Sequence, residues 1–195
     1  MNVTLDECFQ FGLGAFETIG IEQGIPILLD KHLKRLERAA DFLKLGSLSE
    51  RGITARKIEK YLEEQKMRTE VQKEFRNLEH CALKIMLTKE NMVYSLRANH
   101  YTPEKYEKGF FIDISAVKRN ETSPLVYHKT MNYGDCILEK RAATRAGMNE
   151  RIFLNTSGQI CEGTVSNVFF VRKGCIYTPA LSCGLLPGIL REYLL

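Results

Sequence analysis

Apolar and polar residues alternate in several short segments in the way that predicts β-strands. The first segment is a Gly-rich entry into a strand at 11–19, followed by a turn at Gln23-Gly24 and a second strand at 25–29. Three further strands are expected, with a turn at residues 89–91 between the first two, at 81–87, 92–96 and 110–117. The first part of the chain therefore combines a hairpin with a group of three strands.

Two helices are predicted between these strands. Asp30 is the expected N-cap of the first, because apolar residues then recur at helical spacing as far as Leu43. Gly46 is the expected C-terminal stop, and Ser49 is expected to open a second helix that runs through Leu62. The polar stretch at 67–78 gives no prediction.

The second part of the chain follows a polar, Pro-containing stretch at 119–124. We interpret that stretch as a linker, which predicts an N-terminal α/β domain at 1–118 and a C-terminal domain at 119–195. Helical periodicity follows at 133–146, and Pro187-Gly188 opens a last helix. Short strands are expected at 152–154, 165–171 and 175–177. The predicted fold class is therefore mixed, α/β or α+β.

The composition is that of a globular protein. Hydrophobic residues make up 44% of the 195 and charged residues 27%, with a net charge of +4. No basic run has aromatic residues interleaved, and no apolar run approaches the length that spans a bilayer. A small positive charge suits anionic small molecules, so neither a nucleic-acid nor a membrane partner is expected.

The six cysteines carry no metal or disulfide signature. They form no pair with two residues between them, and no histidine lies at a zinc-ligand spacing from them. The first residues lack a basic segment followed by an apolar one, so no signal peptide is predicted. A cytoplasmic location with free thiols is the simplest interpretation, and no metal site is expected.

Four features with chemical potential are weak when each is taken alone. Lys129 is most simply a solvated lysine, Glu162 a turn carboxylate and Arg35 a surface cation. The Pro187-Gly188 pair is most simply an ordinary helix start. Together they supply what pyridoxal 5'-phosphate (PLP) requires: a lysine amine for a Schiff base, a carboxylate for the pyridine nitrogen, and an arginine and a helix N-terminus for the phosphate.

Five blocks of sequence resemble the fold-type IV PLP enzymes, the class IV aminotransferase-like family. They occur in the order of that family, at 11–18, 28–38, 128–133, 162–169, and 177–179 with 184–191. The blocks cover nearly the whole chain, and their combination is specific for the family. The resemblance implies two domains with PLP in the cleft between them, and a homodimer that acts on a small-molecule substrate.

The resemblance also implies roles for individual residues. Lys129 carries the Schiff base and is the expected catalytic residue, Glu162 pairs with the pyridine nitrogen, and Arg35 holds the phosphate. Tyr133 is expected near the ring oxygen. The other implied cofactor-binding residues are Ser166, Asn167, Gly188, Ile189 and Leu190. Leu190 stands where the family commonly has threonine, so only its backbone N–H is expected to reach the phosphate.

Three residues on the expected strands are candidates for contact with a substrate, namely Thr18, Lys84 and Arg97. Packing explains Thr18 equally well, and a solvated face explains the two cations as well or better. The remaining residues close to the blocks are interpreted as packing or polar residues without a catalytic role, and these are His32, His128 and Cys161.

Three functions fit the resemblance. The block at 28–38 favours the lyases that convert 4-amino-4-deoxychorismate to 4-aminobenzoate and pyruvate in folate synthesis. An aminotransferase for branched-chain or D-amino acids is the alternative, because it shares the early steps at Lys129. A cofactor-free scaffold or dimerisation module is the third, since the last helix stops uncapped at Leu195. We accordingly expect an incomplete C-terminal domain.

Overall fold

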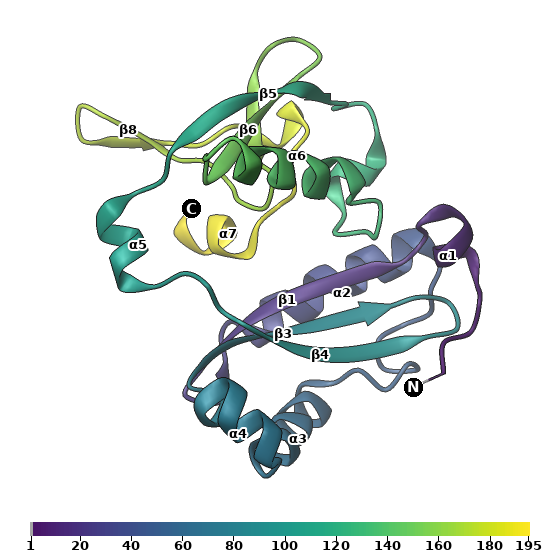
Figure 1. Cartoon of the computed structure of the whole chain (residues 1–195). Helices are drawn as coiled ribbons and strands as arrows, with labels where there is room; N and C mark the ends of the chain where they lie inside the picture. The colour runs from purple at the N-terminus through teal and green to yellow at the C-terminus, as the bar shows by residue number, and fades with distance from the viewer. Residues whose placement is uncertain (1) are drawn as a thin grey trace. The chain divides into compact units, whose positions relative to one another are not determined.

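The computed structural model describes residues 2–195, apart from the side chain of residue 77, and these form two compact units. Unit 1 is the chain up to Thr102 together with Lys129–Asn132, and unit 2 is Pro103–His128 with Tyr133–Leu195. Figure 1 follows the chain from purple at its start in unit 1 to yellow at its end in unit 2. None of the helices in the described part has the length and apolar character needed to cross a membrane.

Unit 1 is built on a four-stranded antiparallel sheet in the order β2-β1-β3-β4 (Figure 1). Its strands are β1 (Ala15–Glu22), β2 (Ile25–Pro26), β3 (His80–Leu87) and β4 (Met92–Ala98). Its helices are α1 (Glu7–Phe11), α2 (Leu29–Leu43), α3 (Ala55–Lys66) and α4 (Thr69–Phe75), followed by the short 3-10 helix η1 (Arg76–Leu78).

The core of unit 1 lies between one face of this sheet and the helices. Alternate residues of β1 and β3, such as Ile19 and Leu83, pack against Leu36 of α2 and Ile58 of α3, and all four are fully buried. Because strand side chains alternate between faces, the intervening residues of β1 and β3 lie on the face opposite to the helices. Burial of each large aliphatic side chain contributes about 1.5–3 kcal/mol, so this cluster fixes the sheet on α2 and α3.

Unit 2 contains a three-stranded sheet in the order β5-β6-β7 and a separate hairpin, β8-β9. The strands are β5 (Ile112–Arg119), β6 (Glu150–Asn155), β7 (Ile160–Gly163), β8 (Phe170–Arg172) and β9 (Cys175–Tyr177). The helices are α5 (Pro103–Lys108), α6 (Gly134–Arg145) and α7 (Ile189–Leu194), with 3-10 turns η2 (Pro124–Tyr127) and η3 (Leu181–Cys183). β5 and β6 are parallel, and α6 lies in the connection between them.

Most predicted elements are confirmed, but two helix starts are wrong. α2 begins at Leu29 rather than after Asp30, because the Ile27 amide donates to the Gly20 carbonyl at 2.9 Å and the chain reverses at Leu28, with φ of +52°. α3 begins after Thr54 rather than at Ser49, because Gly52 takes a left-handed φ of +68°, which a continuing helix does not allow.

Several elements, α1 among them, were absent from the prediction or misplaced. α4 lies in the polar stretch 67–78, and α5 follows β4 directly. The strand expected at 165–171 is replaced by β7, which carries Glu162, and by the later β8. The compact units also differ from the domains expected at 1–118 and 119–195, because β5 pairs with β6 and so belongs to unit 2.

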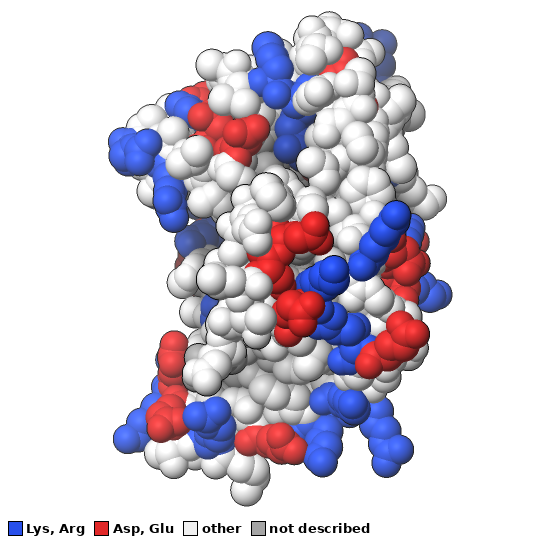
Figure 2. All heavy atoms as spheres, turned by 90° about the vertical axis from the view of Figure 1, so that its right-hand side faces the viewer, with Lys and Arg blue, Asp and Glu red and all other residues white. Residues whose placement is uncertain are grey.

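Charged side chains are distributed over both signs. The face drawn in Figure 2 shows Lys and Arg interspersed with Asp and Glu, without a broad field of one sign. Several of the exposed pairs are salt bridges along helices, such as Lys60 with Glu64 and Lys66 with Glu63 on α3. Pairs of this kind are worth only about 0–1 kcal/mol each, so they do not decide the fold.

Candidate functional site

Lys129 lies in a short extended segment at the edge of the unit 1 sheet. Its carbonyl accepts from the Phe16 amide at 3.0 Å, and the next residue, Thr130, forms an antiparallel bridge with Ala15. Gly14 allows this close approach, since its carbonyl accepts from the Met131 amide at 2.7 Å and a Cβ there would lie 3.0 Å from Met131 Cγ. The segment therefore holds Lys129 by backbone bonds to the first residues of β1.

The Lys129 side chain reaches the sheet face that the helices leave uncovered. Its Nζ lies 4.5 Å from the centroid of the Phe16 ring. Thr130, which alternates with it, is buried at 2% exposure on the bridge to Ala15. The half-buried amine of Lys129 packs against an aromatic ring and is therefore partly removed from water.

All three candidate substrate residues share this face with Lys129. Thr18 stands directly opposite Lys84 in the β1–β3 register, and Arg97 stands opposite Ala82 in the β3–β4 register, one alternation away from Lys84. Lys84 Nζ lies 4.9 Å from the same Phe16 ring. Burial, and then the neighbouring charge of Arg97, lower the pKa of Lys84. Unit 1 thus brings Thr18, Lys84 and Arg97 to the open face beside Lys129.

Arg35 lies on the helix-covered face of the sheet and is bound to a carboxylate that sequence reasoning missed. Its Nε and Nη2 donate to Glu17 of β1 at 2.6 and 2.7 Å, and His32 Nδ1 lies 2.8 Å from the same carboxylate. Glu17 is fully buried. Burial alone would raise the pKa of Glu17, but the hydrogen bonds from Arg35 and His32 leave it below its usual range.

This cluster changes the interpretation of two residues. His32, expected to have no special role, is one of the two cationic or polar partners of a buried carboxylate. Arg35 is held in a fixed orientation by a bidentate pair, in which its Nε and Nη2 donate to the Glu17 carboxylate. Its contact with a phosphate remains a prediction. The available signal for Glu17 was its position in the block at 11–18.

Glu162 lies on β7 in unit 2 and is bound from two sides. Arg119, the last residue of β5, donates from Nη2 to Glu162 Oε1 at 2.6 Å, and the Leu186 amide donates to Oε2 at 3.0 Å. The guanidinium of Arg119 also lies 5.5 Å from the Phe153 ring centroid. Burial would lower the pKa of Arg119, but the Glu162 carboxylate raises it overall, so the arginine stays charged.

The turn that follows Glu162 contains the predicted residues Ser166 and Asn167. The Ser166 hydroxyl donates to the buried carboxylate of Glu150 at 3.0 Å, and the Asn167 side-chain amide donates to the Leu186 carbonyl at 3.1 Å. Because a serine hydroxyl has one proton, Ser166 in this arrangement has no second one for a phosphate. Its role as a cofactor contact therefore remains a prediction that the hydrogen bonding does not favour.

The remaining predicted residues of unit 2 lie at two helix starts. Tyr133 is the N-cap residue of α6 and packs against the cluster that contains Phe153 and Leu185. Gly188 is the N-cap of α7, where a Cβ would collide with Asn167 Oδ1. Ile189 is buried and Leu190 is exposed. Because a leucine side chain has no hydrogen-bond donor, only the backbone N–H of Leu190 can donate to a phosphate.

Each unit contributes side chains of the chemical kind that PLP binding requires. Glu162 accepts from the Arg119 guanidinium and from the Leu186 amide, and its carboxylate is the group that a pyridinium N–H requires. Unit 1 supplies a half-buried primary amine at Lys129 and, from the helix-covered face of the sheet, the buried guanidinium of Arg35. Lys129 belongs to unit 1 and Glu162 to unit 2.

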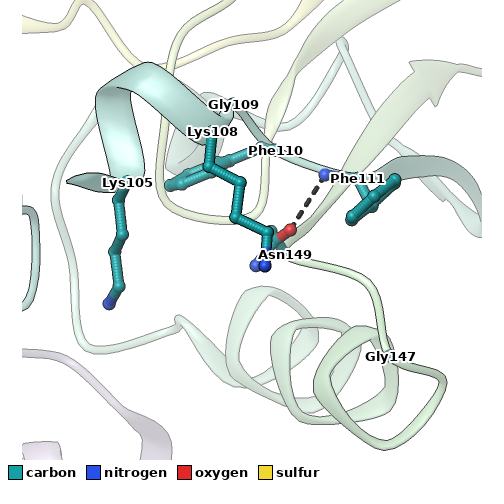
Figure 3. A pocket seen from close by; sticks show the side chains of 7 residues that line it. All are labelled: Lys105, Lys108, Gly109, Phe110, Phe111, Gly147 and Asn149. Atoms are coloured by element: carbon teal, nitrogen blue, oxygen red, sulfur yellow. Dashed lines mark hydrogen bonds between the residues drawn. The ribbon is translucent and has the colours of Figure 1, made fainter.

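A hollow in unit 2 contains none of the predicted residues. Figure 3 shows its lining, with Lys105 and Lys108 of α5, and Phe110 and Phe111 beside Asn149, whose Oδ1 accepts from the Phe111 amide at 2.8 Å. Its volume is about 280 Å³. Within residues 2–195, no group of three or more His, Cys, Asp or Glu residues could hold a metal ion.

Comparison with known proteins gives one family and two kinds of relative. The family model for amino-transferase class IV matches residues 14–195. The chain is 28% identical over 193 residues to the aminodeoxychorismate lyase of Bacillus subtilis (strain 168), covering 97% of this chain and 66% of the relative. It is 32% identical over 177 residues to a Synechocystis protein named "Probable branched-chain-amino-acid aminotransferase", covering 86% of this chain and 55% of the relative. The chain thus spans less than two thirds of the length of each.

Solved structures share the fold. A Legionella pneumophila protein, named for a proposed 4-amino-4-deoxychorismate lyase activity, matches with a TM-score of 0.78 at 24% identity, over 100% of this chain and 72% of that one. The PLP-bound form of a hypothetical aminotransferase from Mycobacterium tuberculosis matches with a TM-score of 0.73 at 19% identity, over 100% of this chain and 71% of that one. The family match covers the blocks around Lys129 and Glu162. The chain therefore belongs to the class IV aminotransferase family, whose members are PLP-dependent enzymes of fold type IV.

Proposed function

We propose that this chain is a PLP-dependent lyase that converts 4-amino-4-deoxychorismate to 4-aminobenzoate and pyruvate. The single observation that carries the choice is the pair of cations, Lys84 and Arg97, on the same sheet face as Lys129. The substrate has two carboxylates, one on the ring and one on the enolpyruvyl group. A branched-chain amino acid has one carboxylate and an apolar side chain, so in an aminotransferase only the acceptor, 2-oxoglutarate, would use both cations.

Lys129, Glu162 and Arg35 each have a task in this proposal. When bound, PLP withdraws electrons from the carbon that bears the substrate amine. Lys129 Nζ takes the proton from that carbon, and the Phe16 ring beside it keeps the amine partly out of water. Glu162, held by Arg119, accepts the pyridinium N–H. Arg35, oriented by Glu17, binds the phosphate.

The aminotransferase is the second candidate, and the Synechocystis relative supports it at slightly higher identity over a shorter span. Both reactions begin with removal of the same proton by Lys129, so they differ only in what leaves the substrate. In the lyase the enolpyruvyl group leaves as pyruvate, whereas in the aminotransferase the amino group stays on the cofactor.

The products decide between the two functions. The chain is incubated with PLP and 4-amino-4-deoxychorismate, and 4-aminobenzoate is followed by fluorescence while pyruvate is measured with a coupled dehydrogenase. The proposal expects both products in equal amounts. Formation of glutamate from leucine or D-alanine and 2-oxoglutarate, with no 4-aminobenzoate, would establish the aminotransferase instead.

Charge-removing variants test the observation behind the choice. Lys84→Met and Arg97→Met keep an unbranched apolar stem and remove the charge. Each is expected to lower kcat/KM by roughly ten- to a hundredfold, mainly through KM, since hydrogen bonds to charged groups are worth about 1.5–3 kcal/mol. Lys89→Met, at the exposed β3–β4 turn, is the matched control and should leave kcat/KM unchanged.

Two further parts of the proposal concern the assembly and its surroundings. We propose a homodimer, which sedimentation would report as twice the chain mass. We also propose a reducing compartment such as the cytoplasm, because the cysteines of the described chain are all free thiols.

A further inference from the structure

Glu150, the first residue of β6, is a buried carboxylate that the proposed function does not use. It is 4% exposed, and Lys140 Nζ of α6 lies 3.8 Å from its Oε2. A buried carboxylate is costly unless hydrogen bonds replace its water shell. Its other partners therefore indicate what the residue does.

One of those partners is the neighbouring Arg151 amide, which donates to Oε1 at 3.0 Å, and the others come from one turn. Oε1 accepts from the amide of Thr164 at 3.1 Å and from the Thr164 hydroxyl, and Oε2 accepts from the Val165 amide at 3.4 Å and the Ser166 hydroxyl at 3.0 Å. Gly163 completes the packing, because a Cβ there would meet Ser166 Oγ and lie 3.1 Å from the Glu150 side chain. The three residues of the turn are thus wrapped around one carboxylate.

The turn is connected to Glu162 through a single residue of another segment. Asn167, directly after the turn, donates to the Leu186 carbonyl at 3.1 Å, and the Leu186 amide donates to Glu162 Oε2 at 3.0 Å. Gly188 keeps this segment close, since a Cβ there would collide with Asn167 Oδ1. The contacts run from Glu150 to the turn, to Asn167, to Leu186 and back to Glu162.

We propose that Glu150 is a positioning residue, which fixes the Thr164–Ser166 turn and thereby holds the Leu186 amide against Glu162. This proposal rests on the proposed function in one respect, namely that Glu162 is the carboxylate that binds the pyridine nitrogen. Glu150 itself touches no ligand. Its effect is to reduce the freedom of Glu162, whose second support is the ion pair with Arg119.

Hydrogen exchange in the protein without PLP tests the connection directly. The variants are Glu150→Gln, which replaces one acceptor oxygen by an amide, and Thr164→Val, which removes one hydroxyl at nearly constant shape. We expect the Leu186 amide to exchange about tenfold faster or more in both, although Glu150 does not contact Leu186. Glu139→Gln is the matched control, because that carboxylate binds Ser115 and Arg151 in the same unit, and it should leave Leu186 unchanged.

Circular dichroism establishes which variants fold. If Glu150→Gln does not fold, the exchange rate of the Leu186 amide in Thr164→Val tests the proposal instead. Unchanged exchange at Leu186 in a folded variant would overturn the proposal. So would equal acceleration in Glu139→Gln, because the effect would then be general loosening of unit 2.

Binding of PLP and of pyridoxal provides the second measurement. Glu162 is proposed to bind the pyridine ring, which PLP and pyridoxal share, and not the phosphate. Glu150→Gln should therefore raise the dissociation constants of both ligands by the same factor, about tenfold or more. Equal affinities in wild type and variant would refute the positioning role. If the wild type binds neither ligand while Leu186 still responds to Glu150→Gln, the proposed function fails and the structural connection stands.

Discussion

Replacing Glu17 by glutamine should destabilise unit 1 far more than the same change at an exposed position of the same strand. Glu17 is fully buried and receives three hydrogen bonds of 2.6 to 2.8 Å from Arg35 and His32. Glutamine keeps one acceptor oxygen but removes the charge, so the buried guanidinium of Arg35 loses the Glu17 carboxylate as a charged partner.

The expected loss follows from that geometry. Removing one partner of a buried ion pair costs about 3–5 kcal/mol. Glutamine retains part of the hydrogen bonding, which places Glu17→Gln near the lower end, about 3 kcal/mol. At an m-value of about 2 kcal/mol per M, the urea midpoint should fall by about 1.5 M.

Glu22 provides the control, because it also pairs with a histidine at 2.8 Å. Its partner His80 lies on β3, and the two side chains are 45% and 41% exposed. Exposed pairs contribute about 0–1 kcal/mol, so Glu22→Gln should move the urea midpoint little. The midpoints are measured by far-ultraviolet circular dichroism at neutral pH.

The pH dependence has opposite signs at the two sites. The pKa of Glu17 is lower in the folded chain than its usual 4.5, so the unfolded state binds the proton more tightly. The stabilisation by the Glu17 carboxylate is therefore complete above pH 4.5 and is lost as the pH falls through the folded-state pKa. The pKa of His80 is raised from its usual 6.5, chiefly by the hydrogen bond to Glu22. The stabilisation by this pair is therefore present below pH 6.5 and is lost as the pH rises through the folded-state pKa of His80. The difference between wild type and Glu17→Gln should therefore shrink only in acid. Equal midpoint shifts for the two variants, or a Glu17 effect that does not change in acid, would refute the reasoning.

Two further predictions concern unit 2. Arg119→Gln should lower the stability of unit 2 by about 3–5 kcal/mol, because buried Glu162 would lose its guanidinium partner, and a urea titration that shows less than about 1 kcal/mol would contradict this. Among the thiols, alkylation at neutral pH should modify exposed Cys175 well before Cys161, since burial raises the pKa of Cys161 to about 11, and peptide mass spectrometry that found Cys161 modified first would disprove the assignment.

Local patterns in the sequence predict the sheet of unit 1 and its long helices well, because strand alternation and helical spacing survive in the core. Helical spacing is also present in the polar segment of α4, where Val71 and Phe75 are buried four residues apart and Leu78 of η1 continues the apolar face. α5 has no buried residue, so no periodicity marks it. The start of α2 depends on a hairpin hydrogen bond, which propensity does not contain.

The candidate site divides in the same way. Lys129 and Glu162 stand in recognisable blocks, whereas their supports come from distant positions. Arg119 lies 43 residues before Glu162, in a stretch interpreted as a linker, and nothing in its neighbours marks it as a partner. Glu150 has the form of any solvated glutamate until the turn it binds is in place. Pairing between distant residues is set by tertiary structure, and a single sequence does not display it.

The central claim, that Lys129 forms the covalent bond to PLP, is tested most directly by reductive labelling. The chain is mixed with PLP, treated with borohydride and digested, and the labelled lysine is identified by mass spectrometry. Lys129→Arg, which keeps the cation on the Phe16 ring, should abolish the label, whereas Lys84→Met, which removes the other amine near that ring, should retain it. A single label on Lys129 is the predicted result. A label on Lys84, a scatter over surface lysines, or a label that persists in Lys129→Arg would contradict the account.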